Sequence, residues 1–212
     1  MDRTKHVLDT CAAVLHRHPA VREAIATTHG DGEPVVYVLP AEGHAFDAPE
    51  LRRILQQEPD PLPEGTALVQ VPELPRTEDG GVDHALLPVY GVLGGLLPLW
   101  REAFGHEGIG PDDDFFALGG YSMLAVRLVG RVADRWGVDL PLADFFDLST
   151  ALDVAHRLVE LGASPTAAEV APHAADELSL EDLLADVDQL SEEQALALLG
   201  LEASPGDDSA RS

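Results

Sequence analysis

The chain has 212 residues, enough for one or two small domains, and 45% of them are hydrophobic, which suffices for a buried core. Its 38 acidic and 13 basic residues give a net charge of −25, so we expect no nucleic acid partner and no membrane partner, because phosphate backbones and anionic lipid would repel it. Cys11 is the single cysteine, which excludes an internal disulfide and a cysteine metal cluster, and no apolar run marks a signal peptide or membrane helix. We therefore expect a soluble, cytoplasmic protein without a metal site.

The first ninety residues show a mixed α/β pattern. Apolar residues at helical spacing predict a helix over 6–18, and the runs AVREAIATT and PVVYVLP predict two adjacent strands on either side of the turn HGDGEP. Asp47 before Pro49 predicts the cap of a short helix over 50–57, and ALVQVPELP predicts a further strand. Residues 1–90 are thus expected to form a small α/β subdomain.

The segment 91–162 shows an all-helical pattern that begins near Gly95. A second helix begins at Ser122, and its apolar residues recur every fourth position at Leu124, Leu128, Val132 and Trp136. PLADFFD predicts a short third helix, and a capping box of Thr150 with Asp153 predicts the start of a fourth. Four such helices predict a small bundle, so the expected fold class for the whole chain is α+β.

The chain after this bundle changes in composition. Residues 163–177 are rich in Ala, Pro, Ser, Thr and Glu without periodicity, as in a linker. Two short amphipathic helices are predicted within 178–201, where Ser179 caps the first and Ser191 with Gln194 begins the second, and 202–212 is expected to be a disordered tail. This helical hairpin is too small to bury both faces, so it either folds back on the bundle or docks on a partner, and the long linker favours docking.

Most active-site motifs fail on inspection. GYSML lacks the second glycine of a nucleophile elbow, and VYGVLGGLLP lacks the lysine and hydroxyl of a phosphate loop, which favours a loop or helix boundary there. His16 and His18 lack the spacing of ligands on one helix face, and the run 112–114 lacks the pattern of a calcium loop. Ser122 remains, with two interpretations: a helix N-cap, or a phosphate attachment point at a helix N-terminus, where free amides favour an anion.

The stretch DDDFFALGGYSMLAVRLVGRV resembles the DxFFxLGGxS core of the peptidyl carrier proteins (thiolation domains) of nonribosomal peptide synthetases. The resemblance extends from Leu93 to Leu161. It implies that Ser122 carries a covalent 4′-phosphopantetheine arm, with Gly119, Gly120 and Tyr121 next to the attachment point. Tyr121 stands where His or Asp is commoner in the family.

The resemblance further implies a carrier with no turnover of its own. A phosphopantetheinyl transferase with Mg²⁺ would attach the arm, and an adenylation enzyme acting in trans would load it with an aminoacyl or peptidyl group as a thioester. Condensation or tailoring enzymes would then receive that group. Partners of the family dock on the second and short third helices, so the docking candidates are Met123, Ala125, Arg127 and Phe145, although each could equally be plain surface or core.

Residues 7–87 show a second resemblance, to the small C-terminal subdomain of adenylation domains, through LHRHPAVREA, PVVYVLP, LRRILQQ and LVQVPELPRTEDGGVD. The family pattern LPxTxNGKVDR contains a lysine that contacts carboxylate and phosphate. Gly81 stands at that lysine here, and His84 replaces the arginine. Glycine offers no cation for developing charge, and the large N-terminal subdomain does not precede this segment, so we expect a truncated structural platform without adenylation activity.

Two hypotheses of different classes follow. The first is a stand-alone peptidyl carrier, loaded in trans, of nonribosomal peptide or related secondary-metabolite biosynthesis. The second is an interaction or regulatory protein that keeps the carrier fold but is never pantetheinylated, so that Ser122 is only a cap. The intact motif around Ser122 beside the degraded one around Gly81 favours the first. A weaker third hypothesis, that residues 1–90 complete a separate large subdomain in trans, conflicts with the missing lysine.

Overall fold

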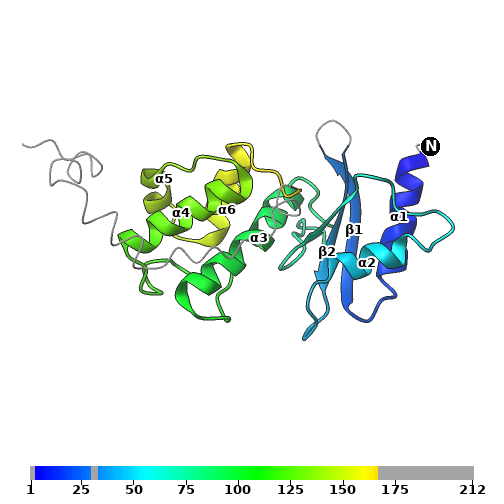
Figure 1. The fold of residues 1–212 in the computed structure, drawn as a ribbon, viewed down its shortest axis with the longest axis horizontal. Coiled ribbons are helices and arrows are strands. Elements are labelled where there is room, and N and C mark those ends of the chain that lie inside the picture. The colour runs from blue at the N-terminus through cyan, green and yellow to red at the C-terminus, as the bar shows by residue number, and fades with distance from the viewer. Residues whose placement is uncertain (1–2, 30–32, 167–212) are drawn as a thin grey trace, which may run out of the picture. The chain divides into compact units, whose positions relative to one another are not determined.

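The computed structural model describes residues 3–29 and 33–166, and all of these lie within one compact unit. They form three strands and six helices, a mixed α+β arrangement that agrees with the expected fold class (Figure 1). The predicted helical hairpin over 178–201 and the tail over 202–212 lie outside the described residues, as does most of the predicted linker. Those features of the chain remain predictions.

The N-terminal part is a three-stranded sheet with two helices. The strands lie in the order β1-β2-β3, with β1 antiparallel to β2 and β2 parallel to β3. The two strands expected on either side of HGDGEP are therefore adjacent, as predicted. In chain order the elements are α1 (Arg3–Leu15), β1 (Val21–His29), β2 (Glu33–Pro40), α2 (Ala48–Leu55) and β3 (Ala67–Gln70).

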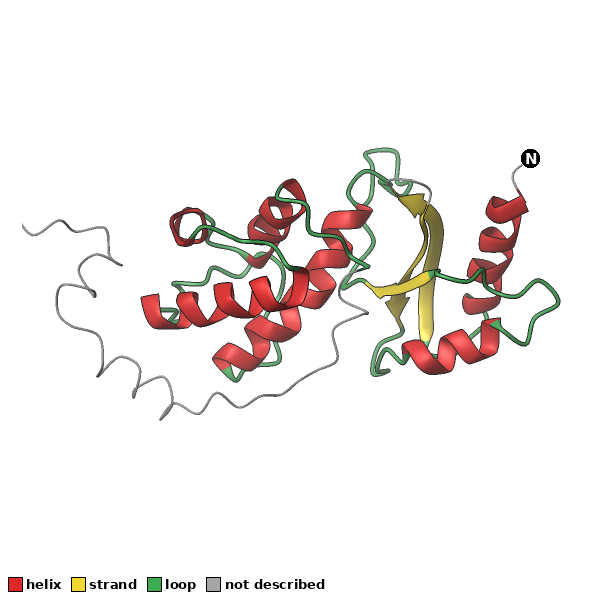
Figure 2. Ribbon diagram, turned by 45° about the horizontal axis from the view of Figure 1, so that its top comes forward, coloured by secondary structure: helices red, strands yellow, loops and turns green. Residues whose placement is uncertain are grey.

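Successive residues of β2 face two different apolar cores. Val36 and Val38 pack with apolar residues of α1 and α2, whereas Val35 and Tyr37 pack with β3 and with Leu87. Because a strand points alternate side chains to opposite faces, both faces of β2 are buried. Figure 2 shows α1 and α2 on one side of the yellow strands.

Helix α2 begins as the sequence predicts. Asp47 is its N-cap, and the Asp47 Oδ1 accepts a hydrogen bond from the Glu50 N–H at 2.9 Å. Pro49 lies in the first turn, where the missing N–H of a proline leaves no acceptor unsatisfied. The helix covers 48–55, slightly earlier than the predicted 50–57.

Helix α3 (Leu87–Phe104) begins well before the expected start near Gly95. The prediction that VYGVLGGLLP is a loop or a helix boundary is therefore wrong, because Gly91, Gly94, Gly95 and Pro98 all lie within the helix. A helical glycine costs about 1 kcal/mol relative to alanine. Ten of the 18 residues of α3 are buried, and this packing offsets the weak helix propensity.

Helices α4 (Ser122–Trp136), α5 (Leu142–Asp147) and α6 (Ala151–Glu160) share one apolar core with α3. The predicted apolar ridge of α4 is buried along its length. Thr150 caps α6 as predicted, because its Oγ1 accepts a hydrogen bond from the Asp153 N–H at 3.1 Å; the Asp153 side chain contacts the Thr150 hydroxyl, at 2.7 Å. Gly137, with φ 65°, ends α4 in the left-handed conformation.

None of the helices in the described ranges is long and apolar enough to cross a membrane. Within the same ranges, no group of three or more His, Cys, Asp or Glu side chains is placed to hold a metal ion.

Candidate functional site

The loop that leads into α4 is anchored by Phe115. Its side chain is fully buried and makes edge-to-face contacts with Trp100 and Phe145, at ring-centroid distances of 5.5 and 5.1 Å. Each such aromatic pair stabilises the fold by about 0.5–1.5 kcal/mol beyond simple burial. The Phe115 N–H also donates to the Ser149 carbonyl at 2.7 Å, so both side chain and backbone fix the start of the loop.

Asp114 shapes the turn that follows this anchor. The Asp114 Oδ1 accepts a hydrogen bond from the Ala117 N–H at 2.7 Å. This bond, together with one from the Ser149 side chain, holds the pKa of Asp114 below its ordinary value of 3.8. The carboxylate therefore stays charged at neutral pH and stabilises the turn through its hydrogen bond with the Ala117 N–H. One member of the charged run 112–114 thus has a structural role.

Gly119 and Gly120 each meet a conformational requirement. Gly119 has φ 93°, in the region that favours glycine. A Cβ at Gly120 would lie 2.3 Å from the Phe115 Cε1 and 2.5 Å from the Phe115 carbonyl oxygen, which no side chain could tolerate without a shift of the backbone. Both glycines therefore serve the turn that places Ser122.

Ser122 is the first residue of α4, and it is exposed. The cap position is held by Tyr121, whose backbone is extended at φ −139° and ψ 166°, and no side chain caps the helix. The interpretation of Ser122 as an N-cap is therefore wrong, because a capping hydroxyl accepts a hydrogen bond from a first-turn amide. The hydroxyl is accessible and is not engaged by the start of its own helix.

Large exposed hydrophobic side chains flank Ser122 in the chain. They come from the loop before α4, from the first turns of α4, and from α5, and within the described residues every exposed large hydrophobic belongs to this set. Two of them, Phe116 and Phe146, stack on each other at a ring-centroid distance of 6.2 Å. We name this set the apolar rim; it consists of Phe116, Leu118, Tyr121, Met123, Val126 and Phe146.

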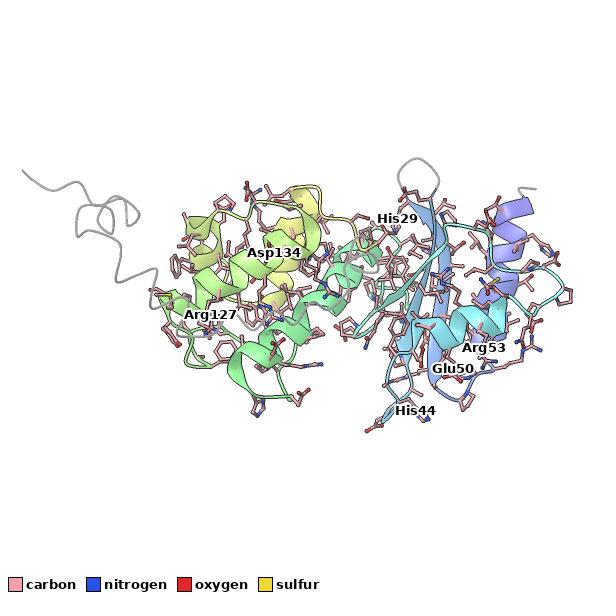
Figure 3. All side chains as sticks on the ribbon, in the orientation of Figure 1. His29, His44, Glu50, Arg53, Arg127 and Asp134 are labelled. Atoms are coloured by element: carbon pink, nitrogen blue, oxygen red, sulfur yellow. The ribbon has the colours of Figure 1, made fainter. Side chains whose placement is uncertain are left out.

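Two of the four docking candidates from the sequence are accessible. Met123 is 50% exposed, and Arg127 lies half-buried on α4 (Figure 3). Ala125 and Phe145 are 0% and 1% exposed, so the prediction that they contact partners is wrong, and the alternative that they are core residues holds.

Of the other members of the apolar rim, Tyr121 was expected only as a neighbour of the attachment point, and Phe116, Leu118, Val126 and Phe146 were not predicted from the sequence. The only signal for Phe116 and Phe146 was their place as the second residue of an FF pair. In both pairs the first phenylalanine is buried and the second is at least 37% exposed. Helical periodicity could have identified Val126 as exposed, because it lies between the buried positions of the α4 ridge.

A separate turn, over 77–81, contains Gly81, which the resemblance to adenylation domains places at the family's lysine. The Thr77 N–H donates to the Gly81 carbonyl at 2.9 Å, and an isolated antiparallel bridge between Arg76 and Val82 closes the turn. The Thr77 hydroxyl donates to Asp79 and lowers the pKa of that carboxyl. Gly81 is exposed, and the Arg76 guanidinium at the base of the turn is paired with Glu23 at 2.5 Å.

Residues 95–158 match the family model described as a phosphopantetheine attachment site, and this range includes Ser122 and its whole apolar rim. The chain is 34% identical over 175 residues to a dimodular nonribosomal peptide synthase of Bacillus subtilis. It is 37% identical over 164 residues to a probable non-canonical nonribosomal peptide synthetase of Salinispora arenicola. Residues 95–158 are a phosphopantetheine-binding carrier domain. Domains of this family carry a covalently attached 4′-phosphopantetheine and are not catalytic themselves.

The carrier domain accounts for only part of the similarity. The two alignments cover 74% and 70% of this chain, more than residues 95–212 could supply, so they extend into the adenylation-like portion upstream. The chain spans 7% and 2% of the two relatives' lengths. A solved structure of a four-domain nonribosomal peptide synthetase bound to AMP and glycine is 25% identical to this chain, with a TM-score of 0.33. The alignment covers 72% of this chain and 13% of the synthetase chain.

Proposed function

We propose that this chain is a stand-alone peptidyl carrier protein that holds an aminoacyl or peptidyl group on a 4′-phosphopantetheine arm attached to Ser122. An adenylation enzyme loads it in trans, and it presents the group to condensation or tailoring enzymes of nonribosomal peptide or related secondary-metabolite synthesis. One observation supports this proposal most. Ser122 is exposed, its hydroxyl does not cap α4, and it lies inside the segment that matches the phosphopantetheine attachment model.

The start of α4 suits a phosphate group. The first amides of a helix have no acceptor within the helix, and no side chain caps those of α4. The partial positive charge at this end of the helix favours an attached anion. When bound, the arm supplies a thiol that carries acyl groups as thioesters. The chain itself keeps the Ser122 hydroxyl accessible, since Gly119 and Gly120 place no side chains beside it.

The apolar rim is the surface through which we expect partner enzymes to recognise the carrier domain. A group of exposed apolar residues with polar surroundings is typical of protein interaction sites. Tyr121 and Met123 lie on either side of Ser122 in the chain and are 58% and 50% exposed. An enzyme that reaches the Ser122 hydroxyl or its arm would therefore meet these two side chains first.

The upstream portion, residues 1–90, is proposed to be a structural platform without adenylation activity. Its turn over 77–81 has the sequence TEDGG, which contains two carboxylates and no cation. Developing negative charge is stabilised by a positioned cation, and the nearby Arg76 is paired with Glu23. The proposed boundary with the carrier domain at residue 90 falls within α3.

The proposal is tested by the intact mass of the full chain after incubation with coenzyme A, Mg²⁺ and a phosphopantetheinyl transferase of broad specificity. The parent chain is expected to gain the mass of one phosphopantetheine. Ser122→Ala is expected to gain none, whereas Ser164→Ala, which removes a half-buried serine outside the matched segment, is expected to behave like the parent.

Two results would contradict the proposal. One is a folded parent chain that gains no mass while the transferase modifies a known carrier. The other is a mass gain that persists in Ser122→Ala. The first result would favour the hypothesis of an interaction protein that keeps the carrier fold without the arm.

A further inference from the structure

Helix α3 belongs to two cores at once. Leu87, its first residue, is fully buried in the core on the sheet side, together with Tyr37, Val69 and Val71. From Val89 onward, the buried apolar side chains of α3 belong to the core that α4, α5 and α6 share. Tyr90 packs against both cores. One continuous helix of 18 residues therefore extends from the sheet into the carrier domain.

Two consecutive glycines of α3, Gly94 and Gly95, lie close to two different elements. A Cβ at Gly94 would lie 2.1 Å from the backbone carbonyl oxygen of Gln70, in β3. A Cβ at Gly95 would lie 2.9 Å from the Trp136 ring and 3.2 Å from the Arg135 Nε, both on α4. Residues adjacent in a helix point about 100° apart, so α3 contacts the sheet on one side and α4 on another.

The connection between the sheet and α3 is short and hydrogen-bonded. The Asp83 N–H donates to the Pro75 carbonyl at 2.9 Å, and the Ala85 N–H donates to the Asp83 Oδ1 at 3.0 Å. Leu86 is then the residue before α3, and its carbonyl accepts from the Tyr90 N–H at 3.1 Å. No stretch with the composition of a flexible linker lies between the last turn of the sheet portion and the helix.

From these contacts we propose that α3 couples the sheet portion rigidly to the carrier domain, so that residues 3–29 and 33–166 move as one body. The glycines at positions 91, 94 and 95 are what permit this coupling. Without side chains, they let the helix lie directly against the backbone of β3 and the side chains of Tyr37 and Trp136. A residue larger than glycine at position 94 would have to displace the β3 backbone or move the helix.

The coupling has a consequence for recognition. Any enzyme that reaches Ser122 must accommodate the sheet portion in one fixed position, so residues 1–90 become part of the surface that partners meet. This inference rests on the contacts of α3 alone, and it stands whether or not Ser122 is pantetheinylated.

The test is the distance distribution between two spin labels, measured by double electron–electron resonance on the full chain. Glu50→Cys places one label on α2, and Asp134→Cys places the other on α4; both residues are exposed (Figure 3). Cys11 is 1% exposed and is replaced by alanine in all samples, so that it takes no label. A single narrow peak is expected, and a broad distribution in this parent would overturn the proposal.

A pair of glycine variants tests the role of α3 separately. Gly94→Ala is expected to replace the narrow peak with a broad distribution, because its Cβ overlaps the Gln70 carbonyl. Gly130→Ala is the matched control, since nothing lies within 4 Å of a Cβ at this glycine of α4, and the peak should stay narrow. A narrow peak in Gly94→Ala would refute the coupling role of this glycine.

Unfolding gives a second measurement that remains informative if Gly94→Ala is poorly folded. Both tryptophans, Trp100 and Trp136, lie in α3 and α4, so their fluorescence reports on the carrier domain, while amide exchange of β2 reports on the sheet. In the parent chain the two probes should give the same unfolding midpoint in urea, as expected of one cooperative unit. Separate midpoints in the parent would contradict rigid coupling.

Discussion

Asp114 connects the loop before Ser122 to the rest of the carrier domain. Its side chain accepts the Ala117 N–H, and its backbone forms an isolated bridge with Thr150, next to the start of α6. Both contacts hold the turn that begins with Phe115 and ends at Ser122. The charge of one carboxylate is therefore linked to the geometry of the attachment loop.

This link predicts a pH dependence of stability. The pKa of Asp114 is lowered in the folded chain by the Ala117 N–H, so the charged form stabilises the fold above the ordinary aspartate pKa of 3.8. That contribution is lost as the pH falls below 3.8 and through the lower folded value. We expect the free energy of unfolding in urea to decrease less between pH 7 and about pH 3 in Asp114→Asn than in the parent.

The control is Asp134→Asn, which changes an exposed aspartate on α4. Its loss of stability with acid should follow that of the parent. Carbon-detected NMR titration of the Asp114 carboxyl gives an independent check, and a midpoint at or above 3.8 would contradict the proposed link.

The two FF pairs show what the sequence does and does not predict at the scale of a residue. Both pairs lie where an aromatic core residue is expected, and Phe115 and Phe145 do contact each other in the core. Nothing in the sequence favours the first phenylalanine of a pair over the second, because short loops and a helix of six residues have too little periodicity. Phe145 was therefore named as a docking candidate, with a core position left open, whereas Phe146 is the exposed residue of the pair.

At the scale of the element, periodic segments were predicted well and α3 was not. The four apolar positions of α4 identify it because burial on a helical period leaves a clear pattern, and the short apolar, β-branched run of β2 identifies a strand that is buried on both faces. Helix α3 contains three glycines, at positions 91, 94 and 95, and the internal Pro98, all of which locally disfavour a helix. Its helical state depends on contacts with Gln70 and Tyr37, which are distant in sequence and cannot be recognised from local propensity.

Helix α4 has a buried face and an exposed apolar one. Leu124 and Leu128 lie in the core, whereas Met123 and Val126 are 50% and 48% exposed. The exposed halves of these two apolar side chains contribute no burial free energy to the stability of the folded chain. A partner that covers this face would recover that burial, which is why we assign the exposed face to recognition by enzymes.

We predict that Met123→Ala lowers kcat/KM for attachment of phosphopantetheine by roughly five- to tenfold, the effect of losing an interface contact of about 1–1.4 kcal/mol. The stability of the chain should change little, because half of the Met123 side chain is already in solvent. Asp134→Ala, near the other end of the same helix, is the matched control and should react like the parent. Equal rates for the two variants would exclude Met123 from the docking surface.

At the scale of the whole molecule, the excess of acidic residues dominates. The chain has 38 Asp and Glu against 13 Lys and Arg, so 25 negative charges have no lysine or arginine charge to neutralise them. Among the described residues, Arg76, Arg131 and Arg157 form ion pairs with glutamate or aspartate, each at least partly exposed. Exposed pairs contribute at most about 1 kcal/mol each, so they leave the repulsion among the remaining carboxylates largely uncompensated.

This repulsion predicts that added salt stabilises the folded chain. Between about 10 mM and 100 mM NaCl the screening length falls from about 30 Å to about 10 Å, which weakens repulsion between distant carboxylates but hardly affects contacts within the core. The urea midpoint should therefore rise over this range, at constant pH 7, with the same increase in choline chloride, since screening does not depend on the identity of the cation. A midpoint that rises with sodium alone would indicate specific cation binding instead. A midpoint that stays constant or falls would show that, despite the net charge of −25, attraction between paired charges in the folded chain equals or exceeds the repulsion among carboxylates.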